Sequence, residues 1–338
     1  MNEHGDRRDA APPASSPASR WLPAGVFGAT LVVASVLLFV RVPTTAIELD
    51  GTFTGLGFVS AQQQPLNRPL SVTALGAAGL TDAQLPEEAA ARGGGVSAIR
   101  VAIDSGGAKS GSGSIVVDRI VVPAGTQVWL SRTGVPRQYR ISFRAKAPEP
   151  ITVHADVMGP VAFAPAGARE TRTTLRAPRP VDVAGTTGTL DLDVTLASGS
   201  PIIRWQQLAA RDLRVYRVED EQDAARPLAR PVSTILSGIM YYESLDGGER
   251  RLRAGEMLRF GAASGTILTL DLRDDGIAAV FQGDVSEMRA GAGDHPRSLM
   301  PTLLEWLRQR QGLSLLWGTA LYLFGMSMTL RRWWRRAG

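Results

Sequence analysis

The sequence has no cysteine among its 338 residues. Structural disulfides, thiol catalysis and metal sites with thiolate ligands are therefore excluded. The absence is compatible with an oxidising compartment. Lysine and histidine are also scarce. The lysines are Lys109 and Lys146, and the histidines are His4, His154 and His295.

Familiar nucleophile and phosphate-loop patterns are missing as well. No Gly-x-Ser-x-Gly pentad marks a serine nucleophile. Lys109-Ser110 resembles the end of a phosphate-binding loop, but Ala108 and Ile103 stand where that motif requires glycine. Neither pattern therefore indicates a catalytic site.

His154 lies in a strand-like segment, 151–157, where it shares a face with Thr152 and Asp156. A metal site would need further ligands from distant parts of the chain. We therefore interpret His154 as a surface histidine, and we predict no catalytic residue, no cofactor and no metal.

Two groups of acidic residues have a competing functional interpretation. Asp191 and Asp193 share a strand face at about 6–7 Å, a spacing that overlaps the carboxylate pairs of glycosidases. The acidic segment 219–223 offers oxygen ligands but lacks the spaced pattern of a calcium loop. We interpret both groups as solvated surface residues.

The net charge is +5, and four arginines fall within the last eight residues. Much of the positive excess is therefore local. The sequence shows no zinc-finger spacing, helix-turn-helix pattern or aromatic–basic platform, so we predict no nucleic-acid partner.

Two long uncharged runs, 22–40 and 311–330, meet the length of about twenty residues that a membrane-spanning helix needs. They predict transmembrane helices over 21–41 and 312–330. A cleaved signal peptide is the alternative for the first run, although its apolar part is longer than usual for one. Small residues recur one turn apart at Ala24 with Gly28 and at Ser314 with Gly318, a spacing that allows close helix packing. The alternative explanation of this spacing is composition, because the whole chain is rich in alanine and glycine.

Basic residues flanking the runs predict the orientation. Both termini are expected in the cytoplasm, with residues 42–310 outside a bacterial inner membrane. The residues expected to set the topology and to lie at the membrane interface are near the C-terminus: Arg331, Arg332, Trp333, Trp334, Arg335 and Arg336.

Between the runs, apolar residues alternate with polar ones, as in antiparallel strands with one wet face. Segments 138–143 and 189–196 show this most clearly, and Leu268, Leu270 and Leu272 repeat it. Residues 274–276 (Asp-Asp-Gly) are typical of a hairpin turn. Segment 200–208 fits a short helix or a strand.

These observations predict a membrane protein in which two transmembrane helices flank a mainly β, sandwich-like extracytoplasmic region of one or two units. The expected parts follow in chain order: a disordered tail 1–20, a helix 21–41, a β unit 42–200, a β unit 201–297, a juxtamembrane helix 298–311, a helix 312–330 and a basic tail 331–338.

The favoured function is a non-enzymatic binding or assembly component of an envelope complex. Its partners would be the lipid bilayer and other envelope proteins or a second copy of the chain. One alternative is an envelope sensor that signals to a cytoplasmic partner. The other is a hydrolase acting on cell-wall glycan or polysaccharide through Asp191 and Asp193.

Overall fold

The computed structural model of the chain is mainly β. Its contacts divide the chain into two compact units, with residues 1–42 and 301–338 in unit 1 and residues 43–300 in unit 2. The structure describes residues 35–87, 97–104, 113–145, 149–166, 170–185, 188–196, 203–221, 228–243, 247–291 and 296–309, together with positions 32, 314, 317, 318, 321, 322, 324, 325, 326, 328, 329 and 332.

Unit 1 contains helix α2, Leu303–Gln309. A capping box starts this helix: the Glu305 N–H donates to Thr302 Oγ1 at 3.2 Å, and the Thr302 N–H donates to Glu305 Oε2 at 2.8 Å. Glu305 near its start and Arg308 near its end complement the helix dipole. The juxtamembrane helix predicted over 298–311 overlaps this element.

The prediction of two membrane-spanning helices is wrong, and so is the two-pass inner-membrane location that rested on it. In the part of the chain that the structure describes, no helix is long and apolar enough to cross a membrane. A span needs about twenty apolar residues in one continuous helix. The apolar runs meet this requirement in composition alone, and much of both predicted spans lies outside the described residues.

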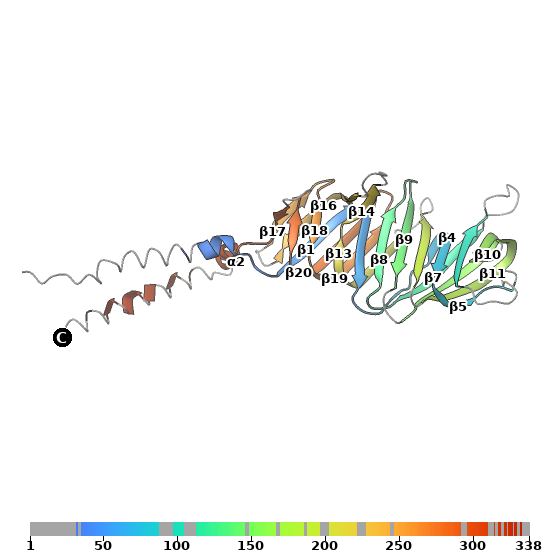
Figure 1. The fold of residues 1–338 in the computed structure, drawn as a ribbon, viewed down its shortest axis with the longest axis horizontal. Helices are drawn as coiled ribbons and strands as arrows, with labels where there is room; N and C mark the ends of the chain where they lie inside the picture. Colours follow the sequence, from blue (N-terminus) through green and yellow to red (C-terminus); the bar gives the residue numbers. More distant parts are fainter. Residues whose placement is uncertain are drawn as a thin grey trace, which may run out of the picture. The chain divides into compact units, whose positions relative to one another are not determined.

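Unit 2 is built on a sheet of 17 strands whose pairings are antiparallel (Figure 1). Strands from the beginning and the end of the unit form its first half, in the order β17, β16, β1, β20, β19, β13 and β2. Their bounds are Gly248–Leu252, Ile235–Tyr242, Thr45–Phe53, Ile277–Val285, Ala263–Leu272, Ile203–Arg214 and Gly55–Ser60.

The sheet continues from β2 into a second half through β8 (Gln127–Arg132), β9 (Gln138–Arg144), β12 (Thr189–Thr195) and β4 (Leu70–Ala78). Strands β6 (Ala98–Ile103) and β7 (Ser114–Val122) both lie between β4 and β10 (Ile151–Pro165). The half ends with β11 (Thr171–Gly185) and β5 (Leu80–Gln84), while the short β3 (Gln64–Leu66) also pairs with β7.

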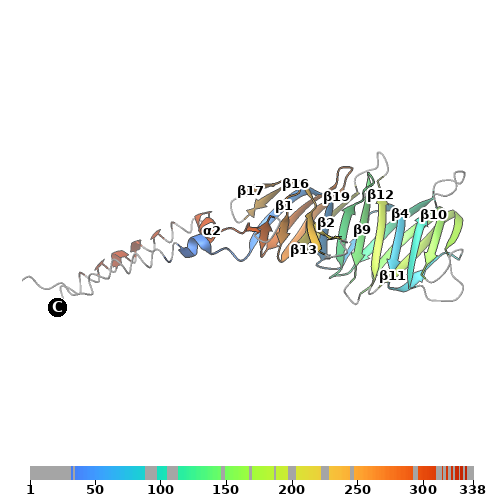
Figure 2. The same cartoon turned by 45° about the horizontal axis from the view of Figure 1, so that its top comes forward.

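Two small sheets accompany the large one. One consists of β14 (Tyr216–Glu221) and β15 (Leu228–Ser233), and the other of β18 (Leu258–Phe260), β21 (Met288–Ala290) and β22 (Arg297–Ser298). In both views of the ribbon, β2, β8 and β9 lie between the region of β1 and β16 and the region of β10 and β11 (Figures 1 and 2). This middle region carries the groove described below.

The alternation predicted from the sequence is confirmed in several strands. In β9, Tyr139, Ile141 and Phe143 are at most 1% exposed, and their neighbours face outward. Strand β12 behaves in the same way, and Arg273 and Gly276 close the predicted hairpin turn with a 2.9 Å backbone hydrogen bond. This β-rich fold is consistent with the expected sandwich-like region. Of segment 200–208, residues 203–208 belong to a strand, β13, and not to a helix, while residues 200–202 lie outside the described residues.

The predicted boundary at residue 200 stays a prediction. Strand β1, from the first proposed unit, pairs along its length with β16 and β20 from the second. Buried side chains from both halves of the sheet form one hydrophobic cluster. Residues 43–300 are accordingly one compact unit by their contacts.

Candidate binding groove

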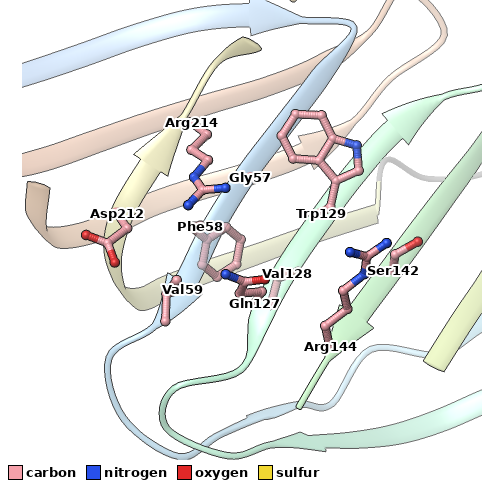
Figure 3. Close-up of a pocket in the computed structure, with 10 residues that line it drawn as sticks. All are labelled: Gly57, Phe58, Val59, Gln127, Val128, Trp129, Ser142, Arg144, Asp212 and Arg214. Carbon is pink, nitrogen blue, oxygen red and sulfur yellow. The ribbon is translucent and has the colours of Figure 1, made fainter. Parts of the chain in front are cut away.

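A groove of about 230 Å³ lies on the outward side of the middle strands (Figure 3). It is lined by residues of β2, β8, β9 and β13, namely Gly57, Phe58, Val59, Gln127, Val128, Trp129, Ser142, Arg144, Asp212 and Arg214. We call it the arginine groove. The strand register places Arg214, Gly57, Trp129 and Ser142 in one row across the four strands.

Trp129 covers the backbone of β2 because that strand has glycine at the contact. A Cβ atom on Gly57 would lie 2.3 Å from Trp129 Cε3, and a Cβ atom on Gly55 would lie 3.1 Å from Trp129 Cζ2. Both distances are too short for comfortable packing. The absence of side chains at Gly55 and Gly57 thus lets the indole pack directly on the β2 backbone, a known use of glycine inside strands.

A β-bulge shapes the other side of the groove. Arg211 pairs with Val59 and Arg214 pairs with Gly57, so β13 has one residue more than β2 in this interval. Asp212 in the bulge has a φ of 53°, a conformation that aspartate tolerates better than most residues. Bulges re-aim side chains, and Arg214 follows this bulge on β13, directly opposite Gly57 (Figure 3).

The two arginines of the groove carry unmatched charge. Arg214 comes from β13 and Arg144 from β9, and both are exposed. Among the described residues, no carboxylate lies within ion-pair distance of either guanidinium. Guanidinium groups present a planar fork of donors that fits a carboxylate in bidentate fashion. Asp212 is the one acidic residue of the lining, so the groove keeps a positive excess and is suited to an anionic group.

In the same sheet, Asp271 on β19 is a buried carboxylate whose charge is paired with two arginines. Its side chain is 2% exposed, and its two oxygens accept hydrogen bonds at 2.8 Å from Nε and one terminal nitrogen of Arg204. Arg273 adds a third hydrogen bond at 3.0 Å. Hydrogen bonding from Arg204 is the largest cause that holds the pKa of Asp271 below its ordinary value of 3.8.

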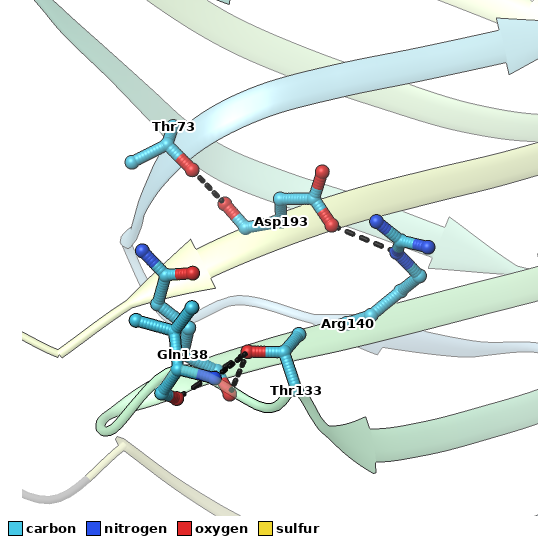
Figure 4. A network of polar contacts seen from close by, with 6 residues as sticks. Thr73, Thr133, Gln138, Arg140 and Asp193 are labelled. Atoms are coloured by element: carbon cyan, nitrogen blue, oxygen red, sulfur yellow. Dashed lines mark hydrogen bonds and ion pairs between the residues drawn. The ribbon is translucent and has the colours of Figure 1, made fainter.

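The carboxylates of the hydrolase hypothesis lie on neighbouring outward positions. Asp191 pairs with Ser142 of the groove, whereas Asp193 pairs with Arg140. Arg140 Nε donates to Asp193 Oδ1 at 2.8 Å, and the Asp193 carbonyl accepts a hydrogen bond from Thr73 Oγ1 (Figure 4). Asp193 is thus engaged in an ion pair, and the hydrolase hypothesis stays a prediction.

The predicted topology and packing residues fall in unit 1. Arg332 is a described, exposed helical residue, as are Ser314 and Gly318, and a Cβ atom on Gly318 would meet no described residue within 4 Å. The other residues of both sets lie outside the described residues: Ala24, Gly28, Arg331, Trp333, Trp334, Arg335 and Arg336. Helix packing at these positions stays a prediction.

Sequence reasoning did not single out Trp129, Arg144 or Arg214. One local signal was available, since Gly55 and Gly57 interrupt an apolar strand at a spacing of two. Such glycines indicate that something approaches the backbone closely. The identity of the approaching residue depends on the pairing of β2 with β8, which no short-range pattern contains.

Comparison of the chain with protein-family models, with curated proteins and with solved structures gives no match.

Proposed function

We propose that this chain is a non-enzymatic binding protein, and that the arginine groove is where it holds a partner protein in an assembly. The partner segment would carry an acidic side chain for Arg144 and Arg214 and an apolar one for the Trp129 indole. This proposal keeps the binding role favoured from the sequence and adds a place for it.

The observation that carries the proposal is one tryptophan between two unmatched arginines. Tryptophan and arginine are the residue types that most often dominate the energy of protein interfaces. The indole supplies a rigid apolar surface, and the guanidinium groups supply direction and charge. At about 230 Å³, the groove has room for one or two side chains rather than for a large ligand.

A photo-crosslinking experiment tests this proposal. A benzophenone amino acid replaces Thr189, which is exposed and pairs with Arg144 across β12 and β9 without lining the groove. The full chain is produced in its own cells and irradiated, and the adducts are identified by mass spectrometry. The matched position for background is Ser264, an exposed residue of β19.

Charge reversal then links an adduct to the groove. Arg214→Glu should abolish the adduct, because it replaces attraction for a carboxylate with repulsion. Arg251→Glu changes the net charge equally at an exposed site on β17 and should leave the adduct intact. An adduct of two copies of this chain would identify the partner as a second copy. Absence of any adduct specific to Thr189, or equal adducts in both variants, would refute the groove as the docking place.

A further inference from the structure

A second group of polar side chains gathers on the outward face of β7 and β10. Asp118, His154 and Asp156 each offer one potential ligand atom, and these three atoms lie within 4.8 Å of one another. We call these residues the aspartate cluster. A hollow of about 560 Å³ adjoins it and is lined by residues that include His154, Asp182, Asp82 and Arg119.

A β-bulge brings Asp118 to the cluster. Arg119 pairs with His154 and Val117 pairs with Ala155, so Asp118 is an extra residue on β7. The buried positions of β7 show the same shift, since Val117 and Ile120 are both 0% exposed with two outward residues between them. The extra residue lies beside the point where β10 presents His154 and, two residues on, Asp156.

Asp182 fixes the histidine of the cluster. It lies directly opposite His154 in the register of β10 and β11, and its Oδ1 is hydrogen-bonded to His154 Nδ1. The other ring nitrogen, Nε2, is then the one available to a ligand. Histidines that bind metal commonly have one ring nitrogen on the ion and the other on a carboxylate.

No described arginine forms an ion pair with the carboxylates of the cluster. The pKa of His154 is raised, first by its hydrogen bond to Asp182 and further by the charges of Asp182, Asp156 and Asp118. Within the described chain, neither Asp118 nor Asp156 has a hydrogen-bond or ion-pair partner. Arg119 lines the adjoining hollow but forms no ion pair with a described carboxylate. Two like charges so close together favour a cation between them.

We propose that Asp118, His154 and Asp156 bind one divalent transition-metal ion, of the kind represented by Zn²⁺ or Mn²⁺, while Asp182 positions the imidazole. One ring nitrogen and two carboxylate oxygens suit these ions, whereas Ca²⁺ and Mg²⁺ favour all-oxygen sites. Metal–ligand distances of about 2.1 Å place ligand atoms about 3.4 Å apart in a tetrahedral site. Small side-chain rotations reach that spacing, and water or a partner group fills the remaining positions.

Isothermal titration with ZnCl₂ and MnCl₂ tests the proposal. The full chain is purified without a histidine tag and dialysed against a chelator before titration. We expect one ion per chain. Affinity should fall about 30-fold or more in Asp118→Asn and in Asp156→Asn, which lose a ligand, and about 10-fold in Asp182→Asn, which loses the positioning contact. CaCl₂ and MgCl₂ should bind at least about tenfold more weakly.

Asp82→Asn is the matched control, because Asp82 lines the same hollow but is not one of the three ligands. Its affinity for Zn²⁺ should stay within about twofold of that of the wild type. An equal loss in Asp82→Asn and Asp118→Asn would mean diffuse attraction of cations and would overturn the proposal, as would failure of the wild type to bind either ion. Circular dichroism of each metal-free variant checks folding, and the two ligand variants provide independent tests.

Discussion

The arginine groove and the aspartate cluster are made by the same structural device and carry opposite charge. Each lies on the outward face of neighbouring antiparallel strands, and each has a β-bulge, at Asp212 on β13 and at Asp118 on β7. The groove carries two exposed arginines and the cluster two half-buried aspartates, and none of these four forms an ion pair among the described residues. One place is thus suited to an anion and the other to a cation.

The difference between these places and Asp271 is equally informative. Asp271 is buried, and Arg204 and Arg273 match its charge with three hydrogen bonds. Charges needed for folding are expected to be satisfied within the fold, whereas exceptions tend to occur at functional sites. The comparison therefore separates residues that should affect stability from residues that should affect binding.

The largest effect should appear when a variant of each site is tested for binding of both ligands, the partner protein and Zn²⁺. Trp129→Ala should reduce partner affinity about 30-fold, because it removes about 2 kcal/mol of a central interface contact. The same variant should leave Zn²⁺ affinity unchanged. Asp118→Asn should show the converse. Titration of both ligands with both variants checks this, and a change in both affinities from either variant would mean that the sites are not independent.

Asp271→Asn should lower the free energy of unfolding by about 2 kcal/mol, because a buried, hydrogen-bonded charge is removed and Arg204 loses its partner. Urea denaturation measures the change. Arg140, whose pair with Asp193 is more exposed, provides the contrast: Arg140→Ala should cost less than about 1 kcal/mol. Equal losses in the two variants would contradict the assigned role of burial.

Lowering the pH should reduce the stability of the fold through protonation of Asp271. Since its pKa is lowered in the folded chain, the folded state binds a proton less readily than the unfolded state, whose carboxyl has the ordinary value of 3.8. The stabilisation is present above about pH 5 and is lost as the pH falls below 3.8 and through the folded pKa. Unfolding between pH 5 and pH 3 should therefore show a steeper loss of stability in the wild type than in Asp271→Asn. Parallel curves would rule this linkage out.

Gly57→Ala should destabilise the chain by about 1 kcal/mol and displace the indole, because the new Cβ atom would lie 2.3 Å from Trp129 Cε3. Tryptophan fluorescence and urea denaturation measure the two effects. Gly76→Ala on β4 is the control, since its nearest contact would be at 3.9 Å. A Gly57 variant as stable as the Gly76 variant would show that packing of the Trp129 indole on β2 does not require glycine at position 57.

The smallest effects are expected where unmatched charges are removed without any ligand present. Arg144→Ala, Arg214→Ala, Asp118→Asn and Asp156→Asn should each change the free energy of unfolding by no more than about 0.5 kcal/mol in metal-free buffer. Thermal and urea denaturation provide the values. A loss comparable to that of Asp271→Asn would assign these residues to the stability of the fold.

The sequence allowed the strands to be predicted where alternation is regular, as in β9 and β12. It did not allow the bulges to be predicted. In β19 the register shifts between Ile267 and Thr269, so Ile267 is 0% exposed while Leu268 is only partly buried, against the expected pattern. A one-residue shift depends on the partner strand, which the local sequence does not contain.

The same limit explains why neither site was predicted. His154 was correctly expected on the face of Thr152 and Asp156, but Asp118 and Asp182 come to it from two other strands. The two transmembrane helices failed for a different reason, because the length and composition of an apolar run do not establish a continuous helix.

The most direct test of the opposite-charge account is the yield of the Thr189 photo-adduct in Arg214→Glu relative to Arg251→Glu. The account predicts that the adduct disappears in the first variant and persists in the second, since only Arg214 lines the groove. Equal yields in the two variants would contradict it.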